Sequence, residues 1–214
     1  MDNGEKWDLG RRTQKIPTRE FGAPGDEIKQ PGVPSASLRR MGMWLLLASL
    51  SMLFGAILVG FLVLRGRAEQ WPPPGSPPLP PGLWVSTTLL VILSAVLVLA
   101  ERGARSGRDA TRDRMLAVAV LLAVAFLAAQ TANWMRMTEY SVLPDQSLFV
   151  WFFYVLTILH AGHVLCGLVP LALVAVRSRA GRYAEGDSEA VHLVGMYWHF
   201  LLATWIAIFA VLSS

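Results

Sequence analysis

Cysteine is almost absent from this sequence, since Cys166 is the only one among 214 residues. A single cysteine excludes an internal disulfide bond and the zinc or iron–sulfur sites that need several thiolates. Charge is also scarce, at 16% of residues against about 25% in average soluble proteins. The charges are clustered, because all 15 acidic residues fall in the first 40 residues or between apolar segments. With 54% hydrophobic residues, this composition indicates a membrane protein.

Five apolar segments meet the length of about 20 helical residues that a bilayer requires. They comprise residues 41–64, 83–100, 115–135, 148–176 and 191–212. The short alternating segments typical of transmembrane strands are missing. The sequence therefore predicts an all-α, polytopic membrane protein with a bundle of five transmembrane helices. The fourth helix must tilt or project from the bilayer because of its length.

No aspartate or glutamate lies inside these five segments, and Glu101 only borders the second one. Proton pumps and ion-coupled transporters need ionisable groups at depth, so a pump or transporter working alone is disfavoured. Internal repeats and broken helices of the transporter kind are also missing. A secretory signal peptide is not expected, because the first apolar segment starts at residue 41 and has full transmembrane length.

Basic residues are distributed unevenly between the two sides of the membrane. One side holds eight, five and three of them, in residues 1–40, 101–114 and 177–190. The other side holds three, namely Arg65, Arg67 and Arg136. The positive-inside rule therefore predicts a cytoplasmic N-terminus and an external C-terminus. The basic residues form no single patch with interleaved aromatic residues, so nucleic-acid binding is not expected.

Two segments lack the pattern of a membrane helix. Residues 1–40 are polar, rich in proline and glycine, and predicted to be a disordered cytoplasmic tail that precedes the transmembrane domain, residues 41–214. WPPPGSPPLPPG, residues 71–82, has seven prolines in twelve residues. Proline lacks a backbone N–H and clashes with the preceding helical turn, so an extended polyproline segment is predicted on the outer surface. It is either a rigid spacer or a docking surface for a neighbouring subunit.

A few polar or amphipathic residues have predictable places. Gln130, Thr131 and Asn133 lie near the outer end of the third helix and are expected to bond to neighbouring helices. Asp145 is the expected N-cap of the fourth helix. Trp44 falls in the first turn of the first helix, at the depth of the lipid headgroups, where interfacial aromatic residues belong.

Histidines are the remaining candidates for chemistry. His160 and His163 share one face of the fourth helix, and His199 could face them from the fifth. Three imidazoles could bind copper or haem. However, His199 lies about 12 Å from the cytoplasmic end of the fifth helix, whereas His160 lies about 24 Å from the cytoplasmic end of the fourth. No carboxylate inside the segments could orient a ligating imidazole. Structural imidazoles are therefore favoured, with a haem or metal site and a lipid-headgroup contact as alternatives.

Several motifs in order resemble one known family. FYVLTILHAGHVLCG (153–167), Arg177 and YWHF…W (197–205) resemble the last two helices of haem-copper oxidase subunit III. GMWLLLAS (42–49) resembles its third helix, and WPPPG (71–75) the loop that follows. The resemblance covers about residues 40–212. Five helices rather than seven match the shorter bacterial form, which lacks the first two.

The resemblance implies a non-catalytic, accessory subunit III of a respiratory terminal oxidase (cytochrome c oxidase) in the inner membrane of a bacterium. Such a subunit packs against the haem-copper subunit I, in a complex with subunit II, and holds phospholipid. It has no catalytic, cofactor-binding or metal-binding residue of its own, so haem and copper are expected in the partner subunits. A subunit III-like protein of a nitric oxide reductase system and a haem-binding membrane anchor are the alternatives.

Site residues follow from the same resemblance. It places His163 and Arg177 near a bound lipid headgroup, although about 21 Å of helix separates them. A long or deeply inserted lipid is therefore required. The residues expected at helix-packing contacts or at the subunit I interface are Trp44, His160, Tyr197, Trp198, His199 and Trp205. Of these, His160 is expected to hydrogen-bond to a neighbouring helix.

The chain also departs from the family pattern at three acidic positions. Leu50 and His192 stand where the family usually has glutamate, and Leu202 stands where it usually has aspartate. A proton-uptake role that depends on those carboxylates is therefore in question. These departures indicate a divergent member of the family.

Overall fold

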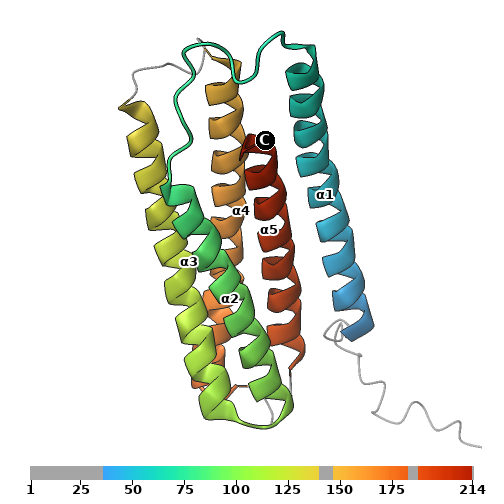
Figure 1. Cartoon of the computed structure of the whole chain (residues 1–214). Helices are drawn as coiled ribbons and strands as arrows, with labels where there is room; N and C mark the ends of the chain where they lie inside the picture. The colour runs from blue at the N-terminus through green and yellow to red at the C-terminus, as the bar shows by residue number, and fades with distance from the viewer. Residues whose placement is uncertain (1–35, 140–146, 183–187, 214) are drawn as a thin grey trace, which may run out of the picture. The chain divides into compact units, whose positions relative to one another are not determined.

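Five long helices account for most of the described chain. The computed structural model describes residues 36–139, 147–182 and 188–213. The helices are α1 (Ala36–Arg67), α2 (Gly82–Arg105), α3 (Asp109–Thr138), α4 (Leu148–Arg179) and α5 (Glu189–Ser213) (Figure 1). Each is long and apolar enough to cross a membrane, and no strand occurs among the described residues. The prediction of an all-α protein with five membrane-spanning helices is confirmed.

Several helices begin before their apolar segments or end after them. α3 begins at Asp109, well before the predicted span at residue 115, and α2 continues to Arg105. Arginine and alanine are strong helix formers, so these charged ends extend the helices beyond the apolar residues. α1 begins at Ala36, so residues 36–40 of the predicted tail are helical. Residues 1–35 of that tail lie outside the described part of the chain.

The helices α2 to α5 pack around one another, and α1 is attached at one side. α2 and α4 each contact both α3 and α5, whereas α1 contacts only α5 and α4 within the described residues. Figure 1 places α1, in blue, at the edge of the bundle. The Phe61 ring of α1 packs edge to face on Trp71 and Phe152, with centroids 5.1 and 5.0 Å apart. Trp44 and Met52 remain largely exposed on α1, and hydrocarbon or a partner protein must cover them.

One end of the bundle collects arginines. The first turns of α1, α3 and α5 and the last turns of α2 and α4 lie there, and we call it the basic end. Arg102 and Arg105 lie in the last turn of α2, and Arg177 and Arg179 in the last turn of α4. Only residues 106–108 connect α2 to α3, with Gly107 at a φ of +65°. A side chain would be strained there, so this glycine permits the tight reversal that aligns the two helices.

The proline-rich segment lies against its own chain at the opposite end. Trp71 packs between Phe61 and Phe149, and Pro77 and Pro80 are buried. A turn closed by the Ser76 backbone N–H on the Pro73 carbonyl interrupts the predicted extended conformation. The rigid-spacer interpretation agrees with this packing, and the docking role stays a prediction.

Two local predictions were wrong. Ser147, not Asp145, is the residue that precedes α4, and Asp145 lies outside the described residues. Thr131 donates its hydroxyl to the Leu127 carbonyl of its own helix at 2.9 Å, and so does not bond across to a neighbour. A threonine hydroxyl in a helix reaches the carbonyl four residues earlier, which explains the difference.

Candidate functional site

His160 is enclosed by aromatic rings at the centre of the bundle. It is fully buried, and its ring centroid lies 6.2 Å from Phe54 of α1, 5.9 Å from Phe126 of α3 and 5.0 Å from Trp205 of α5. Neither ring nitrogen has a hydrogen-bond partner in the part of the chain that the structure describes. The expected helix–helix hydrogen bond of His160 is therefore wrong. Its ring instead packs with those of three other helices.

His163 is turned toward α1. Its ring packs edge to face on Phe54 at 5.2 Å, and its Nδ1 lies 2.8 Å from the Leu159 carbonyl oxygen. A carbonyl oxygen only accepts, so the Nδ1–H of His163 donates this hydrogen bond. The Tyr197 hydroxyl of α5 donates to the His163 carbonyl oxygen at 2.9 Å. His163 thus lies at the point where α1, α4 and α5 meet.

An apolar groove opens at this point. It encloses about 350 Å³ between α1, α4 and α5, with His163, Cys166 and Pro170 on its α4 side and Met43 and Leu46 on its α1 side. A second hollow of about 540 Å³ lies farther along the same two helices, between residues such as Ile57, Trp151 and Ile158. We call the two together the α1–α4 groove. It follows from the limited contact of α1 with the rest of the bundle.

His199 points away from these two histidines. Its Nδ1 lies 2.6 Å from the Ser94 hydroxyl of α2. The idea that His199 faces His160 and His163 is therefore wrong, because α5 directs its imidazole toward α2. Among the described residues, no group of three or more His, Cys, Asp or Glu side chains is placed to hold a metal ion.

Large aromatic residues fill the contacts of α5. The Trp205 indole donates to the Thr87 hydroxyl of α2 at 2.9 Å, and Trp198 is almost fully buried. Tyr197 lies against Gly167 of α4, and a side chain at that glycine would collide with the tyrosine ring. Small residues let membrane helices approach closely, so Gly167 sets the separation of α4 and α5.

The remaining predicted residues lie on the surface of the isolated chain. Trp44 is 64% exposed and contacts no other helix closely enough to be buried. Arg177 is exposed in the last turn of α4. The structure therefore does not bring Arg177 and His163 together. The two residues lie about 21 Å apart along α4.

A polar cluster joins α2 to α3. The Ser86 hydroxyl donates to Gln130 Oε1 at 3.4 Å and accepts a hydrogen bond from Asn133 Nδ2 at 3.2 Å. All three side chains are buried. The prediction that Gln130 and Asn133 bond to a neighbouring helix is confirmed.

Replacing Asn133 tests this cluster. We expect Asn133→Ala to lower the free energy of unfolding by about 1 kcal/mol, because it removes a buried interhelical hydrogen bond. Thr131→Ala is the matched control and should change stability by less than about 0.5 kcal/mol. Thermal unfolding of the two variants in the same detergent makes the comparison. Equal losses would contradict the role given to Asn133.

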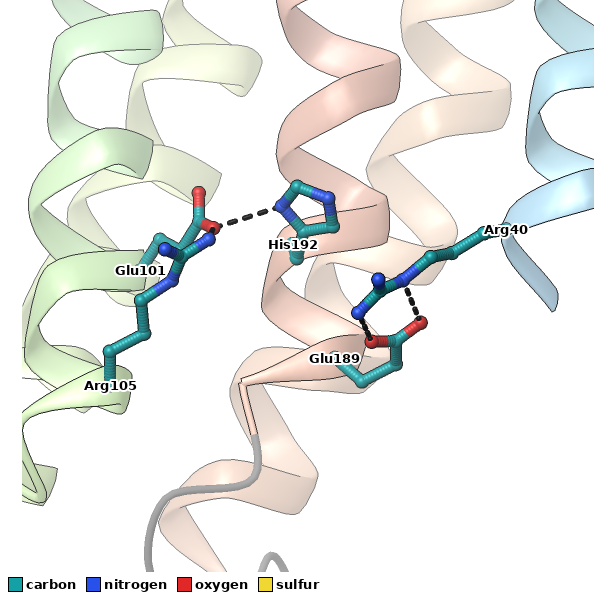
Figure 2. Close-up of polar contacts among 5 residues, drawn as sticks. All are labelled: Arg40, Glu101, Arg105, Glu189 and His192. Atoms are coloured by element: carbon teal, nitrogen blue, oxygen red, sulfur yellow. Dashed lines mark hydrogen bonds and ion pairs between the residues drawn. The ribbon is translucent and has the colours of Figure 1, made fainter. Parts of the chain in front are cut away.

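Three acidic or imidazole groups connect the helices at the basic end (Figure 2). Arg40 of α1 donates from Nε and Nη2 to the two carboxylate oxygens of Glu189 of α5, at 3.0 and 2.5 Å. Glu101 of α2 accepts from Arg105 of its own helix and lies 2.9 Å from His192 Nδ1 of α5. Figure 2 shows the two pairs on opposite sides of the first turn of α5. The contact between Glu101 and His192 could not be predicted from the sequence, because the two residues are 91 positions apart.

The Arg40–Glu189 pair should contribute little. The Arg40 side chain is 54% exposed, and solvent weakens an exposed ion pair strongly. A double-mutant cycle with Arg40→Gln and Glu189→Gln should therefore give only a weak coupling, which falls further when salt rises to about 1 M. Strong coupling, or coupling that salt leaves unchanged, would contradict this expectation.

A buried arginine lies at the same end. Arg112 of α3 is 2% exposed, and its Nη1 and Nε lie 2.7 and 3.2 Å from the carboxylates of Asp109 and Asp113. Its Nε also donates to the Ser178 hydroxyl of α4 at 2.6 Å, and Ser178 donates in turn to Asp113. The sequence did not indicate this cluster, because the five arginines of residues 101–114 have the pattern of a short segment at the headgroups. The spacing of Asp109 and Arg112 suggests an ion pair but not its burial.

Residues 33–213 match the family model described as cytochrome c oxidase subunit III. The chain belongs to this family. A Cytochrome c oxidase subunit 3 of Synechocystis sp. is 32% identical over 193 residues, which cover 87% of this chain and 78% of that protein. Another, of Thermostichus vulcanus, is 30% identical, with 81% and 86% covered. A Probable cytochrome c oxidase subunit 3 of Nocardia farcinica is 25% identical, with 90% and 97% covered.

Family membership confirms the resemblance that the sequence motifs indicated. The chain is an accessory subunit III of a haem-copper oxidase and a multi-pass membrane protein. As an oxidase subunit, it belongs to a complex with other oxidase subunits. Of the three departures from the family pattern, His192 is the one whose new partner is visible, since it meets Glu101 of α2.

Proposed function

We propose that this chain stabilises the haem-copper subunit I of its oxidase and holds phospholipid in the α1–α4 groove. The N-terminus is cytoplasmic, the C-terminus is external, and the membrane is the inner membrane of a bacterium. Subunit II belongs to the same complex, and the haem and copper belong to the partner subunits. The alternatives, a nitric oxide reductase partner and a haem-binding anchor, have no specific observation in their favour.

The α1–α4 groove is the observation that carries the lipid part of this proposal. Its lining is almost entirely apolar, and it lies between two helices that both span the membrane. Packed protein interiors leave few voids larger than a water molecule. The hydrocarbon chains of the bilayer are apolar and can enter the α1–α4 groove from the membrane, so they can fill it.

Arg177 supplies the anchor for such a lipid. His163, Pro170 and Arg177 follow one another at intervals of seven residues on α4, so they share one face of the helix. His163 and Pro170 line the groove, and Arg177 lies two turns beyond it, at the basic end. The guanidinium pairs with the lipid phosphate, and the acyl chains extend along the groove past His163. In this arrangement the headgroup contacts Arg177 alone, and only the acyl chains reach His163.

The stabilising role is tested on the purified oxidase. Subunit III is stripped with detergent, and the loss of the haem absorbance of subunit I is followed on heating, with and without the chain. We expect the complex that retains this chain to have a Tm several degrees higher. An unchanged Tm would contradict a stabilising role.

The lipid role is tested by Arg177→Gln, with Arg102→Gln on α2 as the control. The phospholipid that remains with the complex is extracted and quantified. We expect the Arg177 variant to lose one phospholipid per complex and the Arg102 variant to lose none. Equal lipid contents would contradict the assignment of Arg177.

A further inference from the structure

The opposite side of α4 carries a second groove, which it shares with α3. Its volume is about 320 Å³, and its lining includes Ala117, Val120 and Leu121 of α3 and Ala172, Ala175 and Arg179 of α4. We propose that this α3–α4 groove binds one anionic phospholipid, whose phosphate is held by Arg114 and Arg179 and whose acyl chain lies along the small side chains. The proposal rests on the proposed function through the membrane orientation of the basic end, and it assigns a lipid site separate from the α1–α4 groove.

The alignment of α3 and α4 brings the two arginines to similar depth. The hydrogen bond from Arg112 Nε to the Ser178 hydroxyl, 2.6 Å long, fixes which residues of the two helices face each other. Arg114 is two residues farther into α3, and Arg179 is one residue beyond Ser178 on α4. With a rise of about 1.5 Å per residue, their Cα atoms differ in depth by about 4.5 Å. One phosphate group can therefore contact both side chains.

Both arginines lie on the helix faces that form the groove. Arg114, Ala117 and Leu121 follow the spacing i, i+3 and i+7 on α3, which is a single helix face. Ala172, Ala175 and Arg179 repeat the same spacing on α4. Arg114 and Arg179 are both exposed. Arg179 itself lines the groove, and the α3 face that lines it continues to Arg114 toward the basic end.

The neighbouring acids are engaged elsewhere. Asp109 and Asp113 form ion pairs with the buried Arg112. Neither Arg114 nor Arg179 forms an ion pair within the described part of the chain. Guanidinium groups match phosphate oxygens with paired hydrogen bonds, so these two remain available for an anion.

Charge and shape together select a lipid. A free phosphate would satisfy the arginines but would leave the apolar groove open to hydrocarbon. A helix of a partner protein packed into the groove would cover two arginines that have no acidic partner here, which is costly. An anionic phospholipid places phosphate at the arginines and hydrocarbon beside the alanines, and anionic headgroups are attracted to basic residues at this surface.

The test is phosphatidylglycerol binding to the purified complex, measured by native mass spectrometry. Each arginine near an anionic bilayer surface contributes about fivefold in affinity. We therefore expect Arg114→Gln/Arg179→Gln to weaken binding at this site about thirtyfold. Ala117→Leu keeps both charges but fills the groove, and should weaken binding as well. Arg102→Gln is the control and should bind like the wild type.

Several results would overturn the proposal. One is an intact complex in which the double variant and Ala117→Leu bind phosphatidylglycerol as tightly as the wild type. Another is equally strong binding of phosphatidylcholine, or displacement by glycerol 3-phosphate at the concentrations where phosphatidylglycerol binds. A crosslink from position 114 to a partner subunit would show that protein covers this face. If the chain purifies without other subunits, the proposed function fails, and the same lipid titration on the chain alone still decides this site.

Discussion

Gly167→Leu should separate α4 from α5 and lower the free energy of unfolding by about 3 kcal/mol, the upper range for an overpacked core. The glycine lies directly under the Tyr197 ring, and even a Cβ atom would collide with that ring. Tyr197 cannot easily swing away, because it is buried and its hydroxyl donates to the His163 carbonyl oxygen. The collision must therefore move a helix.

Gly162→Leu is a matched control on the same helix. A Cβ added at Gly162 meets no atom within 4 Å, and leucine is a better helix former than glycine by about 0.8 kcal/mol. We expect this variant to be as stable as the wild type or slightly more stable. Thermal unfolding in detergent, followed by loss of helical circular dichroism, compares the two. Equal stability of both variants would show that Gly167 does not set the separation of α4 and α5.

Arg112→Met should cause the second large loss, about 3 kcal/mol. Removing one partner of a buried ion pair leaves the other charge without compensation, which costs about 3–5 kcal/mol. We expect the lower end of this range for Arg112→Met, because Asp113 is 24% exposed and Ser178 still donates a hydrogen bond to it in the variant. The variant also loses the hydrogen bond between α3 and α4 that Arg112 makes with Ser178.

A second substitution identifies the cause of that loss. In the Arg112→Met background, Asp113→Asn removes the uncompensated charge and should recover about half of the lost stability. Arg102→Met, at an exposed position of α2, should change stability by no more than about 0.5 kcal/mol. Denaturant titration of the four proteins measures these differences. A loss for Arg102→Met as large as that for Arg112→Met would mean that overall charge, not the buried contact, matters.

The helices could be predicted from the sequence because membrane crossing depends on length and apolarity, which are properties of a segment alone. Their ends were less predictable. Arg105 and Asp109 continue the helices, although charge places them outside the hydrocarbon core. The polar contact of Asn133 with α2 could also be predicted, because a buried amide needs a partner and only a neighbouring helix could supply it.

Contacts that depend on helix rotation could not be predicted. His160 and His163 share a helix face in the sequence, yet one is enclosed by aromatic rings and the other lines a groove. His199 bonds to Ser94 because packing turns α5 toward α2. Such rotations follow from close contacts like that of Gly167 and Tyr197. The burial of Arg112 was likewise hidden, because an arginine near the end of an apolar segment is typical of a headgroup contact.

Affinity purification of this chain from native membranes tests the central claim most directly. The membranes are solubilised in mild detergent, the co-purified proteins are identified by mass spectrometry, and a reduced-minus-oxidised spectrum is recorded. An accessory subunit III should bring down a haem-copper subunit I, with the haem bands in proportion to that partner. Recovery of the chain alone in good yield, or haem bands that persist in the chain freed of all partners, would contradict it.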